Sequence, residues 1–184
     1  MPRSPPALPL LLVLLTATFA RAEDAPPKRH GPWVGVMAST SSRFNVGYRE
    51  TYDMQDEIES TVGLGLRAGY DFLKFAGIWA EYAEEIHSGS FSAGLRLTTP
   101  TETVRAGLTG GLRFLGSEPT LPFFTAGLMG EVRPWRHLGF SLEVSKAWPL
   151  QSEVTWHATE TNSGYTLLLD EGPSRVLLGL SWYF

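Results

Sequence analysis

The chain has 184 residues, a length that suits a single domain, and it contains no cysteine. A disulfide framework, a thiolate nucleophile, a zinc–thiolate site and an iron–sulfur cluster are therefore excluded. Its 15 Lys and Arg residues against 19 Asp and Glu residues give a formal net charge of −4. Because a nucleic-acid surface needs clustered positive charge, we expect no nucleic-acid partner.

The first 22 residues follow the pattern of a secretory signal peptide. A short basic start precedes a nearly continuous apolar stretch at 7–20, and the small residues of Ala20-Arg21-Ala22 mark a cleavage site. The apolar stretch is shorter than the run of about 20 residues that a transmembrane helix needs. We therefore expect residues 1–22 to be removed on export, which leaves a net charge of −6 and a Pro-rich leader at 23–32.

Alternation of apolar and polar residues recurs along the rest of the chain, whereas no window has a sustained helical period. In Val62–Phe72, apolar residues alternate with Gly, Arg and Asp, so one face of that strand is apolar and the other polar. The chain is therefore predicted to be all-β. Its eight predicted strands are Trp33–Ala38, Val62–Phe72, Ile78–Ile86, Phe91–Thr98, Thr103–Phe114, Pro122–Arg133, Leu138–Val144 and Arg175–Phe184.

The predicted connections alternate in length, which is typical of an antiparallel up-and-down arrangement. Long polar segments at Ser39–Ser60 and Pro149–Pro173 are expected at one end, and tight turns at the other. Ten strands are an alternative, because Val154–Thr159 and Tyr165–Leu169 also alternate. The flanking prolines favour a protruding hairpin for these two segments. The tight turns are predicted at Leu73–Gly77, Thr99–Glu102 and Pro134–His137.

An amphipathic sheet of this size closes either as a soluble barrel with an apolar interior or as a membrane barrel with an apolar exterior. The polar face carries Arg rather than Lys, together with repeated Gly, Ser and Thr, which suits a narrow lumen. We therefore predict an eight-stranded transmembrane β-barrel whose lumen is filled and sealed by paired side chains. The predicted lumen charges are Arg67, Glu81, Arg96, Arg105, Arg113, Glu131 and Glu143.

Strand length and aromatic placement also favour the membrane alternative. The clear strands approach the length of about 9 to 11 residues that crosses the hydrocarbon. Aromatic residues near the short turns form half of a girdle at the membrane–water interface. These residues are Tyr70, Phe72, Phe75, Trp135, Trp182, Tyr183 and Phe184, with Trp148 and Trp156 toward the opposite interface.

The signal peptide, the eight amphipathic strands and a last strand ending Val176-x-Leu178-x-Leu180-x-Trp182-x-Phe184 resemble the small outer-membrane β-barrels of the OmpA-barrel and OmpX type. In that family, a terminal aromatic residue after alternating hydrophobic residues is the signal read by the barrel-assembly machinery. The resemblance implies a bacterial outer-membrane domain at 33–184, surrounded by lipid and lipopolysaccharide. It also implies periplasmic chaperones and the assembly machinery as partners during biogenesis. We expect a monomer without cofactor or metal.

The long loops are the expected carriers of any specific function, in envelope structure, surface recognition or adhesion. The acidic patch in the first long loop is interpreted as a solvated segment rather than a divalent-cation site, because it lacks the spacing of a calcium loop. Phe44, Tyr48 and Tyr52 in the same loop are equally consistent with partner binding and with packing of the loop on itself. The acidic residues are Asp53, Asp56, Glu57 and Glu59.

An outer-membrane lipid A-modifying hydrolase is one alternative function. The segment His87-Ser88-Gly89-Ser90 invites comparison with lipid A deacylases, whose barrels carry a His/Ser pair, but the Asn and Gly of that family's motif are missing. A plain loop between two strands is favoured there. A second conceivable triad is His157, Ser163 and Asp170. A periplasmic lipocalin-like carrier, with the apolar face inside, is the other alternative, and we expect no enzyme activity.

Overall fold

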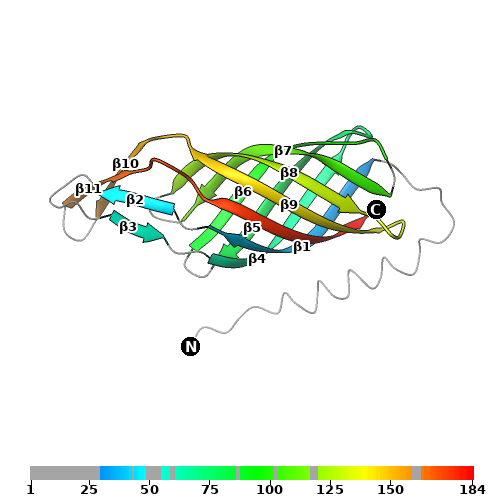
Figure 1. The fold of residues 1–184 in the computed structure, drawn as a ribbon, viewed down its shortest axis with the longest axis horizontal. Helices are drawn as coiled ribbons and strands as arrows, with labels where there is room; N and C mark the ends of the chain where they lie inside the picture. Colours follow the sequence, from blue (N-terminus) through cyan, green and yellow to red (C-terminus); the bar gives the residue numbers. More distant parts are fainter. Residues whose placement is uncertain are drawn as a thin grey trace, which may run out of the picture.

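The computed structural model describes residues 30–42, 44–48, 55–58, 61–85, 88–101, 103–116, 120–158 and 163–184. Eight strands form a closed antiparallel barrel, with neighbours in the order β1-β12-β9-β8-β7-β6-β5-β4 and with β4 pairing back to β1 (Figure 1). The predicted eight-stranded fold is confirmed. The barrel strands are β1 Gly31–Ser41, β4 Thr61–Asp71, β5 Ala76–Glu85, β6 Ser88–Thr98, β7 Val104–Leu115, β8 Leu121–Val132, β9 Leu138–Pro149 and β12 Ser174–Tyr183.

Several strands are longer than their alternation predicted. β9 continues five residues past Val144 to Pro149, because its backbone stays paired with β8 up to Phe123. β1 begins at Gly31, two residues before the expected domain boundary, because Gly31 and Pro32 pair with the end of β4. The predicted signal peptide and most of the leader lie outside the described residues.

A second sheet of four strands, the loop-end sheet, has the order β10-β11-β2-β3. Figure 1 shows these strands beyond one end of the barrel, which we call the loop end, while the C-terminus lies at the opposite turn end. The ten-strand alternative is therefore wrong, since β10 and β11 form a hairpin outside the barrel. The segment predicted as one polar loop contains two short strands. The bounds are β2 Phe44–Tyr48, β3 Gln55–Ile58, β10 Glu153–Ala158 and β11 Ser163–Leu168.

The two faces of the barrel wall differ in polarity. On β4, Val62, Leu64 and Leu66 point outward and are more than half exposed, while Arg67 and Asp71 point inward. Large exposed apolar side chains continue in this way around every barrel strand. Among the described residues there is no helix that is both long and apolar enough to cross a membrane. The exposure of the barrel side chains thus places the apolar face of the wall outside and the polar face inside.

The repeated glycines on the inner face allow neighbouring strands to curve closely past each other. A Cβ atom added at Gly94 in β6 would lie 2.1 Å from the carbonyl oxygen of Gly110 in β7. A Cβ atom at the paired Gly111 would lie 2.2 Å from the carbonyl oxygen of Ala93. Both atoms that it would meet belong to the backbone, so glycine is the residue that fits at these two positions.

Candidate functional site

The lumen at the turn end is filled by a buried ion-pair cluster, the turn-end network. Arg96 donates from Nε and Nη2 to the two carboxylate oxygens of Asp71, at 2.8 and 2.5 Å. Arg105 Nη1 donates to Asp71 Oδ2 at 3.2 Å, and Arg133 Nη2 lies 3.8 Å from the same oxygen. One carboxylate thus faces three guanidinium groups. The network comprises Asp71, Arg96, Arg105, Glu131, Arg133 and Tyr183.

Aromatic side chains enclose the turn-end network. Tyr183 donates its hydroxyl hydrogen to Glu131 Oε2 at 2.7 Å, and Arg133 binds the other oxygen of that carboxylate. The Arg96 guanidinium lies 4.2 Å from the ring centre of Trp33, and that of Arg133 lies 3.4 Å from the ring centre of Tyr183. These rings cover the charges with apolar surface while attracting them electrostatically.

A second cluster, the mid-lumen network, crosses the barrel from β4 and β5 to β9 and β12. Arg67 Nη2 lies 2.5 Å from Glu81 Oε2, and Arg67 Nη1 donates to Glu143 Oε2 at 2.7 Å. Thr109 donates to the second Glu143 oxygen at 2.9 Å, and Arg175 binds the second Glu81 oxygen. Every carboxylate oxygen in this cluster has a donor, so the cluster ties together strands on opposite sides of the lumen.

The loop end of the lumen is closed by apolar side chains, the loop-end plug. Phe123 is fully buried at its centre, and Leu169 enters from the segment after β11. The backbone N–H of Leu169 donates to the carbonyl oxygen of Ser152 at 2.9 Å, and Ala147 N–H of β9 donates to the carbonyl oxygen of Pro173 at 3.0 Å, which ties the end of the same segment to the barrel. The plug residues are Leu115, Leu121, Phe123, Ala147, Leu167 and Leu169.

Two small cavities lie beside the buried charges. A cavity beside Arg67, Arg113 and Arg175 has a volume of about 10 Å³, and one at the turn end beside Asp71 and Arg133 has about the same. Such a volume holds about one water molecule. Each of these two cavities is therefore too small for a hydrated solute.

All seven lumen charges expected from the sequence lie on the inner face. Six of them belong to the two networks, and Arg113 lines the small cavity beside Arg175. The sequence-based list omitted Asp71, Arg133, Arg175 and Tyr183, which bind the same partners. Strand alternation was the available signal for Asp71, because it lies on the polar face of the Val62–Phe72 strand.

The rim aromatics agree with the expected girdle at five positions and differ at two. Tyr183 points into the lumen, as alternation from outward-facing Leu178 and Leu180 requires. Trp182 is only 8% exposed, and the ring of His137 stacks on it with 5.2 Å between the ring centres. Both residues are therefore absent from the outer girdle. Tyr70, Phe72, Phe75, Trp135 and Phe184 are exposed at the turn end, and Val176 is exposed on the outer face of β12.

The candidate catalytic residues lie in two separate parts of the fold. The predicted loop at Ser88–Ser90 is wrong, because these residues begin β6; Ser90 is buried in the barrel and His87 lies outside the described residues. His157 and Ser163 are in β10 and β11, and Asp170 is exposed beyond β11.

The first long loop offers no described metal centre. Of its acidic patch, Asp56 and Glu57 are in β3, and the other members lie outside the described residues. Phe44 and Tyr48 are in β2, while Tyr52 lies outside the described residues. In the part of the chain that the structure describes, no group of three or more His, Asp or Glu side chains is arranged to hold a metal ion.

The fold has clear structural neighbours. The outer membrane protein OprG from Pseudomonas aeruginosa matches with a TM-score of 0.59 and 12% identity, over 88% of this chain and 99% of its own. The chain has the fold of a small outer-membrane barrel. The N-terminal β-barrel domain of OprF from the same organism matches with a TM-score of 0.53 and 12% identity, over 84% of this chain and 99% of its own. No protein-family profile and no curated protein matches the sequence.

Proposed function

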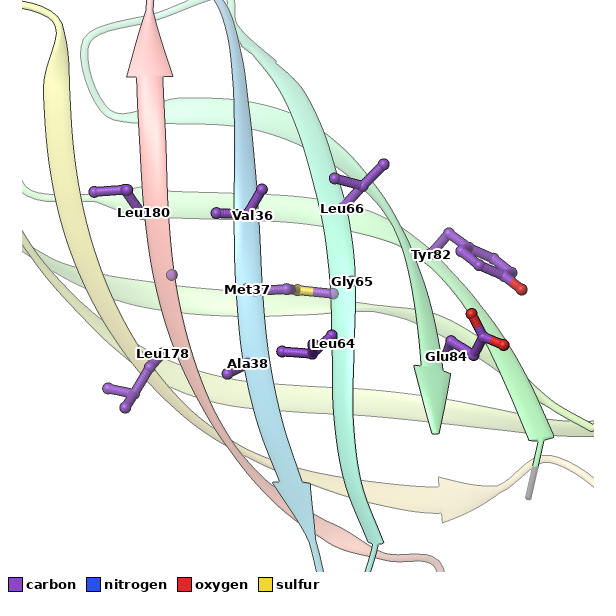
Figure 2. A pocket seen from close by; sticks show the side chains of 11 residues that line it. Val36, Met37, Ala38, Leu64, Gly65, Leu66, Tyr82, Glu84, Leu178 and Leu180 are labelled. Atoms are coloured by element: carbon purple, nitrogen blue, oxygen red, sulfur yellow. The ribbon is translucent and has the colours of Figure 1, made fainter. Parts of the chain in front are cut away.

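We propose that the chain is an integral protein of the bacterial outer membrane. The observation that carries this proposal is the inverted barrel wall, with an apolar belt facing outward around all eight strands and charged groups buried inside. Closure of the sheet satisfies the backbone hydrogen bonds that hydrocarbon cannot satisfy. An apolar groove of about 780 Å³ is lined by residues of β12, β1, β4 and β5 (Figure 2). Acyl chains of the surrounding lipid and lipopolysaccharide fill such a surface.

The barrel serves as a sealed anchor in this proposal, and the loop-end sheet is the part that acts outside the cell. Ion pairs fill the lumen at the turn end and apolar side chains fill it at the loop end, which argues against a pore. The loop-end sheet extends beyond the barrel and has two edge strands, β10 and β3. This arrangement supports a non-enzymatic role in surface recognition, adhesion or envelope structure, with a monomeric barrel delivered by periplasmic chaperones and the assembly machinery.

Cell fractionation tests the proposed location. We expect the protein in the outer-membrane fraction, with a band on a denaturing gel that shifts on boiling, because a closed barrel resists detergent until it is heated. A protein that stays in the soluble periplasmic fraction without detergent would contradict the proposal and support a lipocalin-like carrier. Lipid A hydrolysis by the purified barrel that is lost in Ser88→Ala would contradict the non-enzymatic role.

A planar-bilayer recording tests the sealed lumen. We expect no steady ion conductance from the purified, reconstituted barrel, because ion pairs and the loop-end plug occupy the lumen and the two cavities beside the buried charges each hold about one water molecule. The control is the same preparation after a heat-modifiability check, so that only folded barrels are counted. A stable conductance that grows with the amount of folded barrel would show that the lumen is open.

A further inference from the structure

One small cavity of the lumen, which we call the arginine cavity, faces more basic than acidic side chains. It has a volume of about 10 Å³, and the described residues that line it include three arginines but one carboxylate, that of Glu143. The arginines are Arg67, Arg113 and Arg175. Both oxygens of the Glu143 carboxylate already accept hydrogen bonds, from Arg67 and Thr109. The wall of the arginine cavity is therefore positive and rich in hydrogen-bond donors.

Arg175 carries donors that the mid-lumen network does not use. Its Nη1 binds Glu81, whereas its Nε and Nη2 have no hydrogen-bond partner within the described part of the chain. The Arg175 side chain is only 6% exposed, so water outside the barrel does not reach these two atoms. A guanidinium group has donors only and keeps its charge in proteins. The two N–H groups therefore require an acceptor inside the lumen.

Ser92 of β6 adds a hydroxyl group to the same wall. It is 2% exposed and lies opposite Arg113 of β7 in the strand register. Its Oγ makes no hydrogen bond to any described residue. In the barrel order, three strands separate β6 from β12 in either direction, so Ser92 and Arg175 approach the arginine cavity from opposite sides of the wall.

The loop-end plug adjoins the arginine cavity. Ala147 belongs to the plug and also lines the cavity, and so does the buried Pro173, whose carbonyl oxygen accepts a hydrogen bond from Ala147 N–H. The cavity is therefore bounded by apolar groups on this side. Attraction between opposite charges is stronger in such surroundings than in water.

We propose that the arginine cavity is an anion site that binds one chloride ion between Arg175 and Ser92. The N–H groups of Arg175 and the hydroxyl group of Ser92 donate to the ion, and the other two arginines add positive charge to the wall. The volume of about 10 Å³ excludes phosphate, sulfate and other oxyanions, because it is that of about one water molecule. A water molecule fits the wall less well, because it has two hydrogens of its own to donate and the cavity is lined mainly by donors.

Urea unfolding of the purified barrel in detergent micelles tests this proposal. Chloride is exchanged for gluconate, which is too large for the cavity, at constant ionic strength. We expect chloride to raise the urea midpoint of the wild-type chain at constant slope, because an ion bound only by the folded state stabilises that state. Ser92→Ala removes one donor and should weaken chloride binding about tenfold. Arg175→Lys keeps a cation for Glu81 but removes both available N–H groups, and should weaken it about a hundredfold.

Ser90→Ala is the matched control for Ser92→Ala. Ser90 is on the same strand, is also 2% exposed, and its Oγ likewise has no partner in the described ranges. It does not line the arginine cavity, so its removal should leave the chloride response unchanged. A crystal grown in chloride and measured at long X-ray wavelength should show the anomalous signal of one ion between Arg175 and Ser92.

Three results would overturn the chloride site. The first is an equal urea midpoint of the wild-type chain in chloride and in gluconate, which would leave water as the occupant. The second is an undiminished chloride response in Ser92→Ala, or in an Arg175→Lys barrel that still shows the heat-modifiable band. The third is an anomalous map without a peak in the cavity. None of these results depends on the membrane in which the barrel resides, so the proposed location is tested separately by fractionation.

Discussion

At the turn end the lumen is filled by two carboxylates, three arginines and a tyrosine, whereas at the loop end it is filled by Phe123 and other apolar side chains. The charged end is built almost wholly from strand residues that alternation places on the inner face. The apolar end includes Leu169, which reaches the barrel from outside its strands. The lumen is thus filled in two ways. At the turn end, charged side chains of the barrel strands pair with each other. At the loop end, apolar side chains of the strands pack against apolar side chains from the segment around Leu169.

The largest effect is expected from Asp71→Ala at the charged end. This carboxylate binds Arg96 and Arg105 and lies near Arg133, so its removal leaves three buried arginines with Glu131 as the one remaining carboxylate of the turn-end network. We expect a loss of about 4 kcal/mol in the free energy of unfolding, measured by urea titration of the barrel in micelles. Asp170→Asn, at an exposed loop position, is the control and should change it by less than about 0.5 kcal/mol. A loss below about 1 kcal/mol for Asp71→Ala would show that the charged end contributes little.

A somewhat smaller effect is expected from Phe123→Ala at the apolar end. The ring is completely buried, and its deletion leaves a cavity among the plug side chains. We expect a loss of about 3 kcal/mol by the same urea titration. Phe124→Ala removes the exposed neighbouring ring from the outer wall and should cost clearly less in micelles. Equal losses for the two variants would mean that the plug adds nothing to stability.

Leu169→Ala sharpens the comparison, because it weakens the loop's share of the plug and leaves the barrel wall intact. Leu169 is 1% exposed, and its backbone is tied to Ser152. We expect a loss of about 2 kcal/mol, at the low end for a buried leucine, because a loop segment relaxes more readily than a strand. Proteolysis should also cut the Leu150–Pro173 segment faster in this variant than in Asp170→Asn. Unchanged cleavage would argue that the plug does not hold this segment.

The smallest effect is expected from Tyr183→Phe, which keeps the ring beside Arg133 and removes one hydroxyl. That hydroxyl donates to Glu131 at 2.7 Å, and a lost hydrogen bond to a charged group costs about 1.5 kcal/mol. The urea midpoint should fall while the slope stays constant, because the same surface is exposed on unfolding. A midpoint equal to that of the wild-type chain would show that water replaces the hydroxyl without loss.

The eight barrel strands could be predicted from the sequence because one face of each strand is apolar and points outward while the other is polar and points into the lumen. Apolar and polar residues therefore alternate along each strand. The loop-end plug could not, since Phe123 and Ala147 break the rule that the inner face is polar. This also accounts for the weaker alternation of the Pro122–Arg133 strand, where two phenylalanines follow each other. Phe123 faces the lumen and Phe124 faces outward. The apolar surroundings of Phe123 include Leu169, which lies about 45 residues further along the chain, so a local pattern does not reveal them.

The rim and the loop-end sheet illustrate two other limits. Tyr183 was assigned to the outer girdle because it is aromatic and near a rim, although strand alternation places it inside, where it binds Glu131. Alternation is the stronger guide here, since a one-residue shift reverses the face of every side chain. The strands β2 and β3 were missed because they have only 5 and 4 residues, β3 is mostly polar, and their pairing is set by contacts with each other and with β11.

The pairing of β2 with β11 has a consequence for the order in which the molecule is completed. The ladder between β1 and β12 runs from Trp33 opposite Tyr183 to Ser41 opposite Arg175, and it resumes beyond the barrel where Gly47 is opposite Leu168. These partners are more than 100 residues apart, so the seam is the least local pairing in the chain and is slow to form. A barrel with an open seam would lack the link that joins the two halves of the loop-end sheet. We therefore expect the complete loop-end sheet only on molecules in which β1 and β12 have paired.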